Sequence, residues 1–356
     1  MQPSDAPLRP VTFHPDIPAI GFIAQTKLPS ACTIEYASDV NRLAQAIRTL
    51  DIRGAPALGV AGAYGVALAA LTSTSTEMNA FIADVTHAAE LLISTRPTAV
   101  NLSYGINRVL TRVNHERNSS AATAVAISEA EAVADEDTST CHAIGEHGLK
   151  ILPRKCRILT HCNAGALACR EWGTALGVIR SAVQAGYEVQ VYACETRPLL
   201  QGARLTAWEL SRDGIDVTVI TDSMAASLMR KGMIDLVIVG ADRITCDAVF
   251  NKIGTYMHAV CAKAHNLPFY VAAPLSTFDE EAEEADIIVE QRAREEVACF
   301  GGTKTIPDTV KVYNPAFDAT PLSLVTGIIT EYGILRLPEE LTRIGQIRKE
   351  QQEQNQ

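Results

Sequence analysis

A cysteine and an aspartate each follow a run of apolar residues that has the length of a buried strand. Cys162 closes the stretch LTHC ahead of Asn, Ala and Gly, and Asp242 follows the stretch VIVGA. An open α/β sheet binds its ligand at the carboxyl ends of its strands, where small neighbours leave room for that ligand. We therefore expect a catalytic thiol and carboxyl at one sheet edge. The alternative is a buried apolar cysteine and an aspartate that caps a helix.

Two more strand ends carry polar residues. The segment CETRPLLQGARL, residues 194–205, places Arg197 and Gln201 just before a predicted helix. A guanidinium beside a helix N-terminus suits a phosphate group, although a solvated loop with a helix cap fits equally well. The segment TDSMAA follows the apolar run DVTVI, and its Thr, Asp and Ser form a helix entry that is predicted to cap the next helix. All of these residues are predicted to lie along the same edge of the sheet.

Arginines also precede helices in the first part of the chain. The segments IRGAPALG, residues 52–59, and STRPTAVNL, residues 94–102, each set an arginine beside a proline or glycine. Arginine with exposed backbone amides is typical of a phosphate site, and a plain connection between helices is the alternative. Asn251 and Lys252 of NKIGTY follow Asp242 closely in the sequence. An amide and a cation are therefore expected on the segment that follows the carboxyl.

The sequence predicts neither a metal site nor a nucleotide cofactor. His161 adjoins Cys162, but neighbouring side chains of a strand point to opposite faces, so the two are poor partners for one ion. His161 is instead predicted to be packed or hydrogen-bonded. No GxGxxG follows a strand and no GxxxxGK[ST] occurs, which argues against nicotinamide and P-loop chemistry.

Composition limits the classes of partner. The 356 residues carry a net charge of −10, which argues against duplex nucleic acid or an anionic membrane as the main partner. Residues 55–74 are long enough to span a membrane, but their Ala and Gly content favours a buried, closely packed helix. The nine scattered cysteines form no CxxC pair, and MQPSDAPLRP lacks the pattern of a secretory leader. Both features predict a cytoplasmic protein with reduced thiols.

The elements that must position these residues follow from hydrophobic periodicity. The first part of the chain has helical periodicity over 39–50, 55–73, 77–95, 98–115 and 120–150. After Pro153, the β-rich runs RILTHC, EVQVYAC, DVTVI, DLVIVG and FYVAA alternate with helical segments. This alternation predicts an α/β fold with a mostly parallel sheet and helices on both faces. KVYNPAFD is a further predicted strand, and Thr320 with Pro321 is predicted to begin a helix over LSLVTGIITEYGIL.

Taken together, these motifs resemble the methylthioribose-1-phosphate isomerase family. The motifs that carry the resemblance run in order along nearly the whole chain: QTKLP, IRGAPALG, STRPTAVNL, LTHCNAG, ETRPLLQGARLTAWEL, TDSMAA, GADRI, NKIGTY and VYNPAFDATP. The resemblance implies a mostly helical N-terminal domain, expected over 1–135, and a Rossmann-like catalytic domain without a dinucleotide, expected over 136–356. It also implies a homodimer that needs no cofactor or metal.

The resemblance further implies a reaction and a set of site residues. The reaction is 5-methylthioribose 1-phosphate to 5-methylthioribulose 1-phosphate in methionine salvage. Asp242 corresponds to the general acid/base and Cys162 to a second catalytic residue. The expected substrate contacts are Arg53, Gly54, Ala55, Arg96, Gln201, Asn251 and Lys252. Cys162 serves either as a base for an enolate route or as a group that stabilises charge during a hydride shift.

Related proteins keep other functions open. Isomerases of ribose 1,5-bisphosphate and regulatory subunits of the translation-initiation exchange factor share part of the pattern, and 5-deoxyribose 1-phosphate is another candidate substrate. Two departures bear on this choice. The turn ITCDAVF between GADR and NKIGTY is one residue shorter than the family pattern and lacks its glycine, and Tyr104 replaces an expected tryptophan. Both concern the substituent at C5 more than the isomerisation itself.

Overall fold

The computed structural model describes residues 7–336, 340 and 343–347. Within these residues the chain forms two compact units. The helical unit contains residues 7–142 together with Ala164–Gly177, and the sheet unit contains Ala143–Asn163 and the residues from Val178 onward. The segment after Cys162 therefore returns to the unit that is formed by the first part of the chain. The division into 1–135 and 136–356 stays a prediction.

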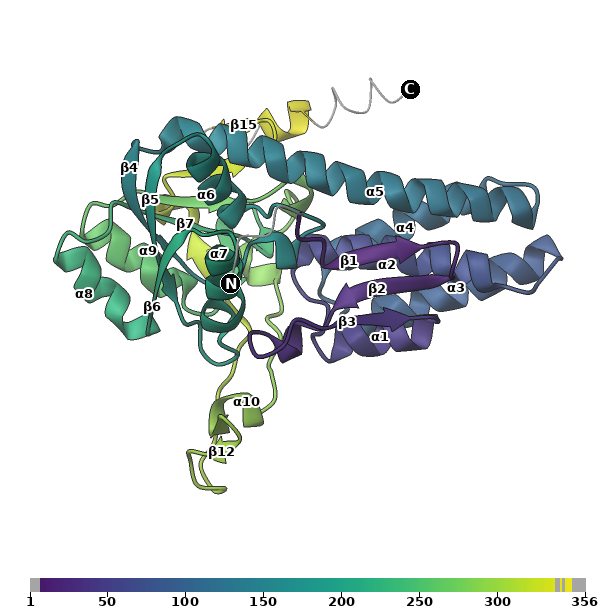
Figure 1. Ribbon diagram of the computed structural model, residues 1–356, viewed down its shortest axis with the longest axis horizontal. Coiled ribbons are helices and arrows are strands. Elements are labelled where there is room, and N and C mark those ends of the chain that lie inside the picture. Colours follow the sequence, from purple (N-terminus) through teal and green to yellow (C-terminus); the bar gives the residue numbers. More distant parts are fainter. Residues whose placement is uncertain (1–6, 337–339, 341–342, 348–356) are drawn as a thin grey trace. The chain divides into compact units, whose positions relative to one another are not determined.

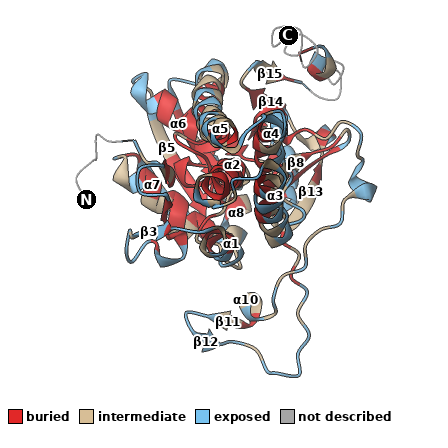
Figure 2. Ribbon diagram, turned by 90° about the vertical axis from the view of Figure 1, so that its right-hand side faces the viewer, coloured by how far each residue is buried: buried red, intermediate tan, exposed pale blue. Residues whose placement is uncertain are grey.

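Five helices dominate the helical unit, as their periodicity predicts (Figure 1). They are α1 Val40–Arg48, α2 Ala55–Thr72, α3 Met78–Thr95, α4 Val100–Asn114 and α5 Ser119–Gly148. Helix α2 is buried along most of its length, and Figure 2 shows it among α1, α3, α4 and α5. By length and composition it could cross a membrane, yet 78% of its most apolar window is buried inside the protein, as in the core helix of a soluble protein. The expectation of a closely packed core helix is confirmed.

A three-stranded antiparallel sheet in the helical unit was not expected from the sequence. Its strands are β1 Val11–His14, β2 Ala19–Ile23 and β3 Ile34–Ala37, in the order β1-β2-β3. Phe13 stacks on Tyr64 of α2 with 5.4 Å between the ring centroids, and Ile20 and Phe22 belong to the same core. The strands are short and lack a clean alternation, so their pairing depends on this helical surface.

Helices α2 and α4 approach each other through glycines. A Cβ atom on Gly59 would lie 3.0 Å from the Asn101 carbonyl oxygen, and one on Gly62 would lie 2.9 Å from Leu102 and from Ile106. The contacts advance in the same direction along both helices, so α2 and α4 run parallel. Their N-termini therefore lie at the same end of the unit.

The sheet unit contains seven strands in the order β15-β14-β10-β7-β4-β5-β6. Their bounds are β4 Lys155–Thr160, β5 Glu188–Cys194, β6 Asp216–Ile220, β7 Leu236–Val239, β10 Phe269–Ala272, β14 Gly327–Thr330 and β15 Gly333–Leu335. All neighbours pair in parallel except β14 with β15. Counted in sequence order, the six parallel strands lie 3-2-1-4-5-6, which is the Rossmann order. The expected α/β fold with a mostly parallel sheet is confirmed.

The crossovers on the two sides of β4 run in opposite directions along the sheet. The helices that follow the strands are α6 Ala175–Gln184, α7 Ala207–Arg212, α8 Ala225–Arg230 and α9 Thr255–Ala264. Because crossovers between parallel strands are right-handed, opposite directions place the helices on opposite faces. The buried residues of β7 and β10 then form one apolar core with residues of α8 and α9.

The predicted helix at Thr320 and Pro321 is wrong. These residues end strand β13 Phe317–Pro321, a 3-10 turn covers Leu322–Leu324, and β14 and β15 follow. Thr320 pairs with Val249 in a small antiparallel sheet, and β14 adds to the large sheet beside β10. The threonine and proline fit a helix start locally, but pairing with distant strands overrides that preference. The strand expected over KVYNPAFD begins only at Phe317.

Short elements complete the sheet unit. The small antiparallel sheet has the order β13-β9-β8, with β8 Arg243–Ile244 and β9 Ala248–Lys252. A segment farther along the chain carries α10 Glu295–Ala298, β11 Cys299–Phe300 and β12 Thr303–Lys304, and Figure 1 labels part of it below the sheet strands. The β8–β9 hairpin is the part that matters for the site, because it begins directly after Asp242.

Replacing Gly105 with alanine tests the glycine contact. A Cβ there would lie 2.1 Å from the Gly59 carbonyl oxygen, so one helix must shift. We expect Gly105→Ala to lower the free energy of unfolding by about 2–3 kcal/mol in urea titrations followed by circular dichroism. Asn107→Ala, at an exposed position of α4, is the control and should change it by less than about 0.5 kcal/mol. Helix propensity alone predicts the opposite sign, about 1 kcal/mol of stabilisation, and that result would contradict the close approach.

Candidate active site

Cys162 and Asp242 follow neighbouring strands of the large sheet. Strand β4 lies between β5 and β7, and the chain passes from β4 to β5 on one side but reaches β7 on the other. This reversal is the switch point of the sheet, where a crevice opens outside the carboxyl ends of the strands. Cys162 follows β4 and Asp242 follows β7, so both belong to the switch point. The loop after β5, which carries Arg197 and Gln201, and Asp222 after β6 lie at the same sheet edge, as predicted.

Cys162 is held in an unusual backbone conformation. Its φ is +65°, in the left-handed region that residues other than glycine rarely adopt. The Cys162 amide donates to Thr196 Oγ1 at 2.9 Å, and its carbonyl accepts from Thr206 Oγ1 at 2.6 Å. Two hydroxyls from other elements therefore maintain this conformation. Strained positions of this kind occur where the surrounding structure aims a functional side chain.

The residue after Cys162 is tied to a buried ion pair. Asn163 Nδ2 donates to Glu209 Oε1 at 2.8 Å and to Thr206 Oγ1 at 3.2 Å. Arg180 Nη2 donates to the other oxygen of Glu209 at 2.8 Å, and both side chains of this pair are buried. Removing one partner of such a pair would leave an uncompensated buried charge, so the network resists rearrangement. It anchors the turn that carries Cys162.

Asp242 stands at the start of the β8–β9 hairpin. Arg243 pairs with Phe250, so continuing the register by one residue places Asp242 opposite Asn251, and the Asp242 amide donates to the Phe250 carbonyl at 2.9 Å. The shortened turn of this hairpin closes without glycine. Thr245 Oγ1 donates to Asp247 Oδ1 at 2.8 Å, and none of residues 245–248 has a positive φ. The hairpin thus brings Asp242, Asn251 and Lys252 to one end.

Asn251 and Lys252 are both buried, although lysine is usually a surface residue. Lys252 Nζ donates to the Ala316 carbonyl at 2.8 Å, and Asn251 Nδ2 donates to Thr255 Oγ1 at 3.1 Å. Asp318 lies beside them and accepts from the Gly254 amide at 2.7 Å. Burial raises the pKa of Asp318 to about 6 despite its bonds to backbone amides. Lys252 is therefore an oriented cation rather than a solvated one.

The loop after β5 presents Gln201. Thr196 and Leu200 have φ values of +67° and +60°, and a π-helix, Gly202–Thr206, begins directly after Gln201. Such π-turns are frequent at functional sites. Among the described residues, no group lies within hydrogen-bonding distance of the buried Gln201 Oε1. A buried amide oxygen without a partner is costly, and a bound ligand would satisfy it.

Arg197 of the same loop is engaged within the protein. Its Nη1 donates to the Pro198 carbonyl at 2.8 Å, and its guanidinium lies over the Phe300 ring at 5.3 Å. The suggestion that Arg197 meets a phosphate therefore gains no support from its contacts. Gln201, from the same motif, remains the better ligand group.

In the helical unit, the arginine motifs lie at the N-termini of parallel helices. Arg53 precedes α2 and Arg96 precedes α4, so the packing of these helices brings both to one end of the unit. Gln25 of the QTKLP motif orients Arg53: its Oε1 accepts from Arg53 Nε at 3.0 Å, while its Nε2 donates to the Leu167 carbonyl at 2.8 Å. Two guanidinium groups beside two sets of helix amides suit an anion.

The glycine before α2 has a structural requirement. Gly54 has a φ of +96°, and a Cβ there would lie 2.4 Å from the Ala168 Cα. Ala55 then begins α2 and Pro56 occupies its first turn. Gly54 therefore lets the segment Ala164–Gly177 pass directly against the start of α2, which explains RGAP in packing terms.

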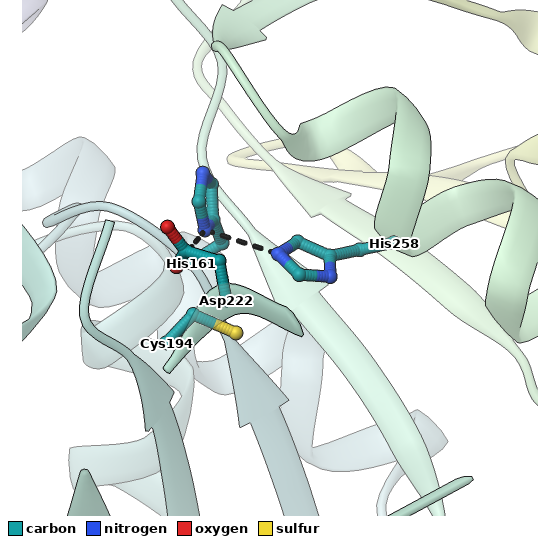
Figure 3. Close-up of side chains that lie close together, drawn as sticks. All are labelled: His161, Cys194, Asp222 and His258. Carbon is teal, nitrogen blue, oxygen red and sulfur yellow. Dashed lines mark hydrogen bonds and ion pairs between the residues drawn. The ribbon is translucent and has the colours of Figure 1, made fainter. Parts of the chain in front are cut away.

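Two clusters in the described part of the chain have donor atoms close enough for a metal ion. His161, Cys194, Asp222 and His258 bring their donor atoms within 4.8 Å of one another (Figure 3). Burial lowers the pKa of His161 to about 4 and that of His258 to about 3, so both imidazoles are neutral at pH 7. His161 Nε2 donates to the Ile253 carbonyl at 2.9 Å, in agreement with the expectation that it is packed and hydrogen-bonded.

The second cluster, Asp137, Cys141 and Cys169, belongs to the helical unit. Asp137 accepts from the Arg170 amide at 2.6 Å, and burial raises its pKa to about 6. The pKa of Cys141 is also raised, chiefly by its hydrogen bond with Cys169. A buried thiol with a raised pKa is a weak metal ligand, since metal ligands must lose their protons.

Several residues of the site have roles that were not predicted from the sequence. Thr196, Thr206 and Glu209 hold Cys162 and Asn163, and Asp318 lies beside Lys252. Asn101, in the STRPTAVNL motif, is buried, and its Oδ1 has no hydrogen-bond partner among the described residues. All five lie within quoted motifs. Their hydroxyl, amide and carboxyl groups inside apolar segments were the available signal.

Comparison with known proteins places this arrangement in a family. A sequence model described as the initiation factor 2 subunit family matches residues 51–337. A methylthioribose-1-phosphate isomerase of Heliobacterium modesticaldum is 54% identical over 320 residues, which cover 88% of this chain and 92% of that protein.

Two solved structures are also similar. The 5-methylthioribose 1-phosphate isomerase of Pyrococcus horikoshii is 42% identical, with a TM-score of 0.90 and 97% of each chain covered. A structure described as translation initiation factor eIF-2B, subunit delta, from A. fulgidus is 51% identical, with a TM-score of 0.85, and covers 94% of this chain and 97% of its own. The chain thus belongs to the initiation factor 2 subunit family, together with relatives named methylthioribose-1-phosphate isomerase.

Proposed function

We propose that this protein isomerises 5-methylthioribose 1-phosphate to 5-methylthioribulose 1-phosphate, a step of methionine salvage. The observation that carries the proposal is the pair at the switch point: a thiol after β4 and a carboxyl after β7, on neighbouring strands. Relatives with about half of their residues identical bear the name of this activity. The substrate is a small sugar phosphate, and the proposal requires neither nucleic acid nor a membrane.

The chemistry of an aldose 1-phosphate explains why an acid is needed. The anomeric oxygen carries the phosphate, so the ring cannot open by loss of an anomeric hydroxyl proton. A proton delivered to the ring oxygen allows the bond between C1 and that oxygen to break. Asp242 is proposed as the acid that delivers this proton.

Hydrogen must then move from C2 to C1. In one route Cys162 removes the C2 proton, an enol forms between C1 and C2, a proton is returned to C1, and the C2 hydroxyl loses its proton to give the ketone. In the other, the hydrogen at C2 shifts to C1 as hydride, and the C2 hydroxyl loses its proton to give the ketone. In both routes the phosphate stays on C1, so the pocket must hold it while the carbon skeleton reacts.

The proposed substrate contacts are of two chemical kinds. Arg53, Gly54, Ala55 and Arg96 supply guanidinium groups and helix amides, which suit the phosphate. Gln201, Asn251 and Lys252 supply an amide oxygen, a second amide and a buried cation, which suit sugar hydroxyls and developing negative charge. A homodimeric, cytoplasmic enzyme without a cofactor completes the proposal.

Asp242→Asn tests the acid. The amide keeps the size of the side chain but cannot deliver the proton, so we expect kcat to fall by about 10²–10⁴-fold. Substrate binding, measured by isothermal titration, should change by less than about threefold. Asp216→Asn, an exposed carboxylate at the start of β6, is the control and should leave both quantities unchanged. Turnover by Asp242→Asn at the wild-type rate would remove Asp242 from the mechanism.

Cys162→Ser tests the thiol. A hydroxyl is a much weaker acid than a thiol and cannot serve as its thiolate does, so we expect a loss in kcat of about 10²–10⁴-fold. Cys261→Ser, on α9, is the matched control and should retain activity. Turnover of the wild type in D₂O then separates the routes: deuterium at C1 indicates exchange through an enol, and its absence indicates hydride transfer or a shielded proton. Full activity of Cys162→Ser would exclude both proposed roles.

Closely related substrates are alternatives within the same class. Phosphorus NMR of the products from 5-methylthioribose 1-phosphate, 5-deoxyribose 1-phosphate and ribose 1,5-bisphosphate ranks the three directly. We expect the methylthio sugar to have the highest kcat/KM. Isomerisation of none of them would refute the enzymatic assignment.

A regulatory, non-catalytic protein is the second candidate, because the A. fulgidus structure with 51% identity is described as an initiation-factor subunit. This candidate predicts an obligate complex with different subunits. Native mass spectrometry of the protein purified from its own cells distinguishes the two. A homodimer with isomerase activity favours the enzyme, whereas a hetero-oligomer whose function survives Cys162→Ser and Asp242→Asn favours the subunit.

A further inference from the structure

Asp222 does not perform the role that its sequence context predicts. The short helix that it begins, Asp222–Met224, receives no hydrogen bond from a capping side chain. The Asp222 carboxylate instead bonds to the loop after β5: its Oδ1 accepts from the Thr196 amide and its Oδ2 from the Arg197 amide, each at 2.8 Å. Both oxygens therefore hold consecutive backbone amides of a neighbouring loop, and the capping prediction for the segment TDSMAA is corrected.

These bonds act on a strained residue. Thr196 is completely buried and has a φ of +67°, which is unfavourable for a β-branched residue. A conformation of this kind persists only where surrounding contacts determine it. The two amide bonds to Asp222, together with the bond from the Leu200 amide to the Thr196 carbonyl at 2.7 Å, are such contacts.

The Thr196 hydroxyl links these contacts to Cys162 by a hydrogen bond. Its oxygen accepts from the Cys162 amide at 2.9 Å, and its proton goes to the Cys194 carbonyl at 3.0 Å. Cys162 is the other strained residue of this edge, with a φ of +65°. Two left-handed residues on neighbouring strand ends thus support each other through one hydroxyl.

The nearby histidines extend the hydrogen-bond network as far as His258, whose buried Nδ1 has no hydrogen-bond partner among the described residues (Figure 3). His161 Nε2 donates to the Ile253 carbonyl, so its Nδ1 carries a lone pair, which accepts from His258 Nε2 at 3.2 Å. The Thr196 hydroxyl is 3.5 Å from the same nitrogen, but its proton is used at the shorter bond to Cys194. A metal ion at this point would compete with the His161–His258 bond and with both amide bonds of Asp222. These hydrogen bonds therefore favour a structural role for the cluster over a metal site.

We infer that Asp222 and Thr196 are positioning residues for Cys162. Asp222 holds the Thr196 and Arg197 amides, and the Thr196 hydroxyl holds the Cys162 amide, so the thiol keeps its place at the switch point. Because Gln201 lies five residues farther along the same loop, the pair also sets the register of that side chain. The inference rests on the proposed function only where activity is measured.

Substitutions at Thr196 test the hydroxyl. Thr196→Val keeps the β-branched shape and removes the hydrogen bonds, whereas Thr196→Ser keeps the hydroxyl. We expect Thr196→Val to lower kcat by about 10–100-fold with KM changed by less than about threefold, because misplacement of a reacting group affects the chemical step. Thr196→Ser should restore most of the rate. A general loss of stability would not separate these two variants in this way.

A second measurement does not depend on the substrate. Iodoacetamide alkylation of the Cys162-containing peptide, quantified by mass spectrometry in the folded protein, reports the exposure and acidity of the thiol. We expect the alkylation rate to change at least about threefold in Thr196→Val, and to stay near the wild-type rate in Thr196→Ser. If the wild type isomerises no sugar, the proposed function fails while this test still decides the inference.

Asp222→Asn tests the origin of the constraint. One of its two acceptors becomes a donor that faces a backbone amide, so the loop loses a bond and gains a repulsive contact. We expect kcat and the alkylation rate to change in the same direction as in Thr196→Val. The double variant should be no more impaired than the worse single variant, because both changes break one network. Ser223→Ala, at the exposed neighbouring position, is the control.

Three results would overturn the inference. The first is a wild-type kcat and alkylation rate in Thr196→Val with a cooperative melting transition. The second is Thr196→Ser being as impaired as Thr196→Val. The third is one equivalent of zinc in the purified wild type that is lost in both Asp222→Asn and His258→Gln, which would make the cluster a metal site.

Discussion

The pairing of β4 with both β5 and β7 is the constraint on which the rest of the site depends. Because parallel strands need crossovers, a central first strand forces the chain to wind outward in both directions, and a crevice must open where the direction reverses. Cys162 and Asp242 are the residues that follow the two strands at this point. The sheet topology therefore brings Cys162 and Asp242 to the same edge, and no local property of either segment could do so.

The position of a residue at a strand end does not fix the orientation of its side chain. Here an unusual backbone conformation fixes it. Cys162 and Thr196 both occupy the left-handed region, and hydroxyl, carboxylate and amide groups from four segments hold them there. The buried Arg180–Glu209 pair fixes Asn163 on the other side of the thiol. These bonds are made between buried groups, where each lost partner is expensive, so the arrangement is rigid before any ligand arrives.

In the helical unit, helix packing rather than backbone strain positions the candidate binding groups. Glycines at 59, 62 and 105 allow α2 and α4 to pack closely in parallel, and this alignment places two helix N-termini and two arginines at one end. The macrodipoles of both helices then favour an anion there. Gln25 orients Arg53 from a distant loop, so the group is arranged in advance for a phosphate.

By itself, the sequence determined the helices, the central parallel strands and the motifs that identify the family. Amphipathic periodicity, and the continuous apolar runs of strands buried on both faces, are local properties that need no partner to be recognised. The tertiary structure decided the rest. Strands β1 to β3 and β14 formed where distant surfaces were available, Thr320 paired instead of beginning a helix, and Asp222 bonded to another loop instead of capping its own. Each of these outcomes depends on partners far apart in the chain, whose hydrogen bonds and burial outweigh the local preferences of a few residues.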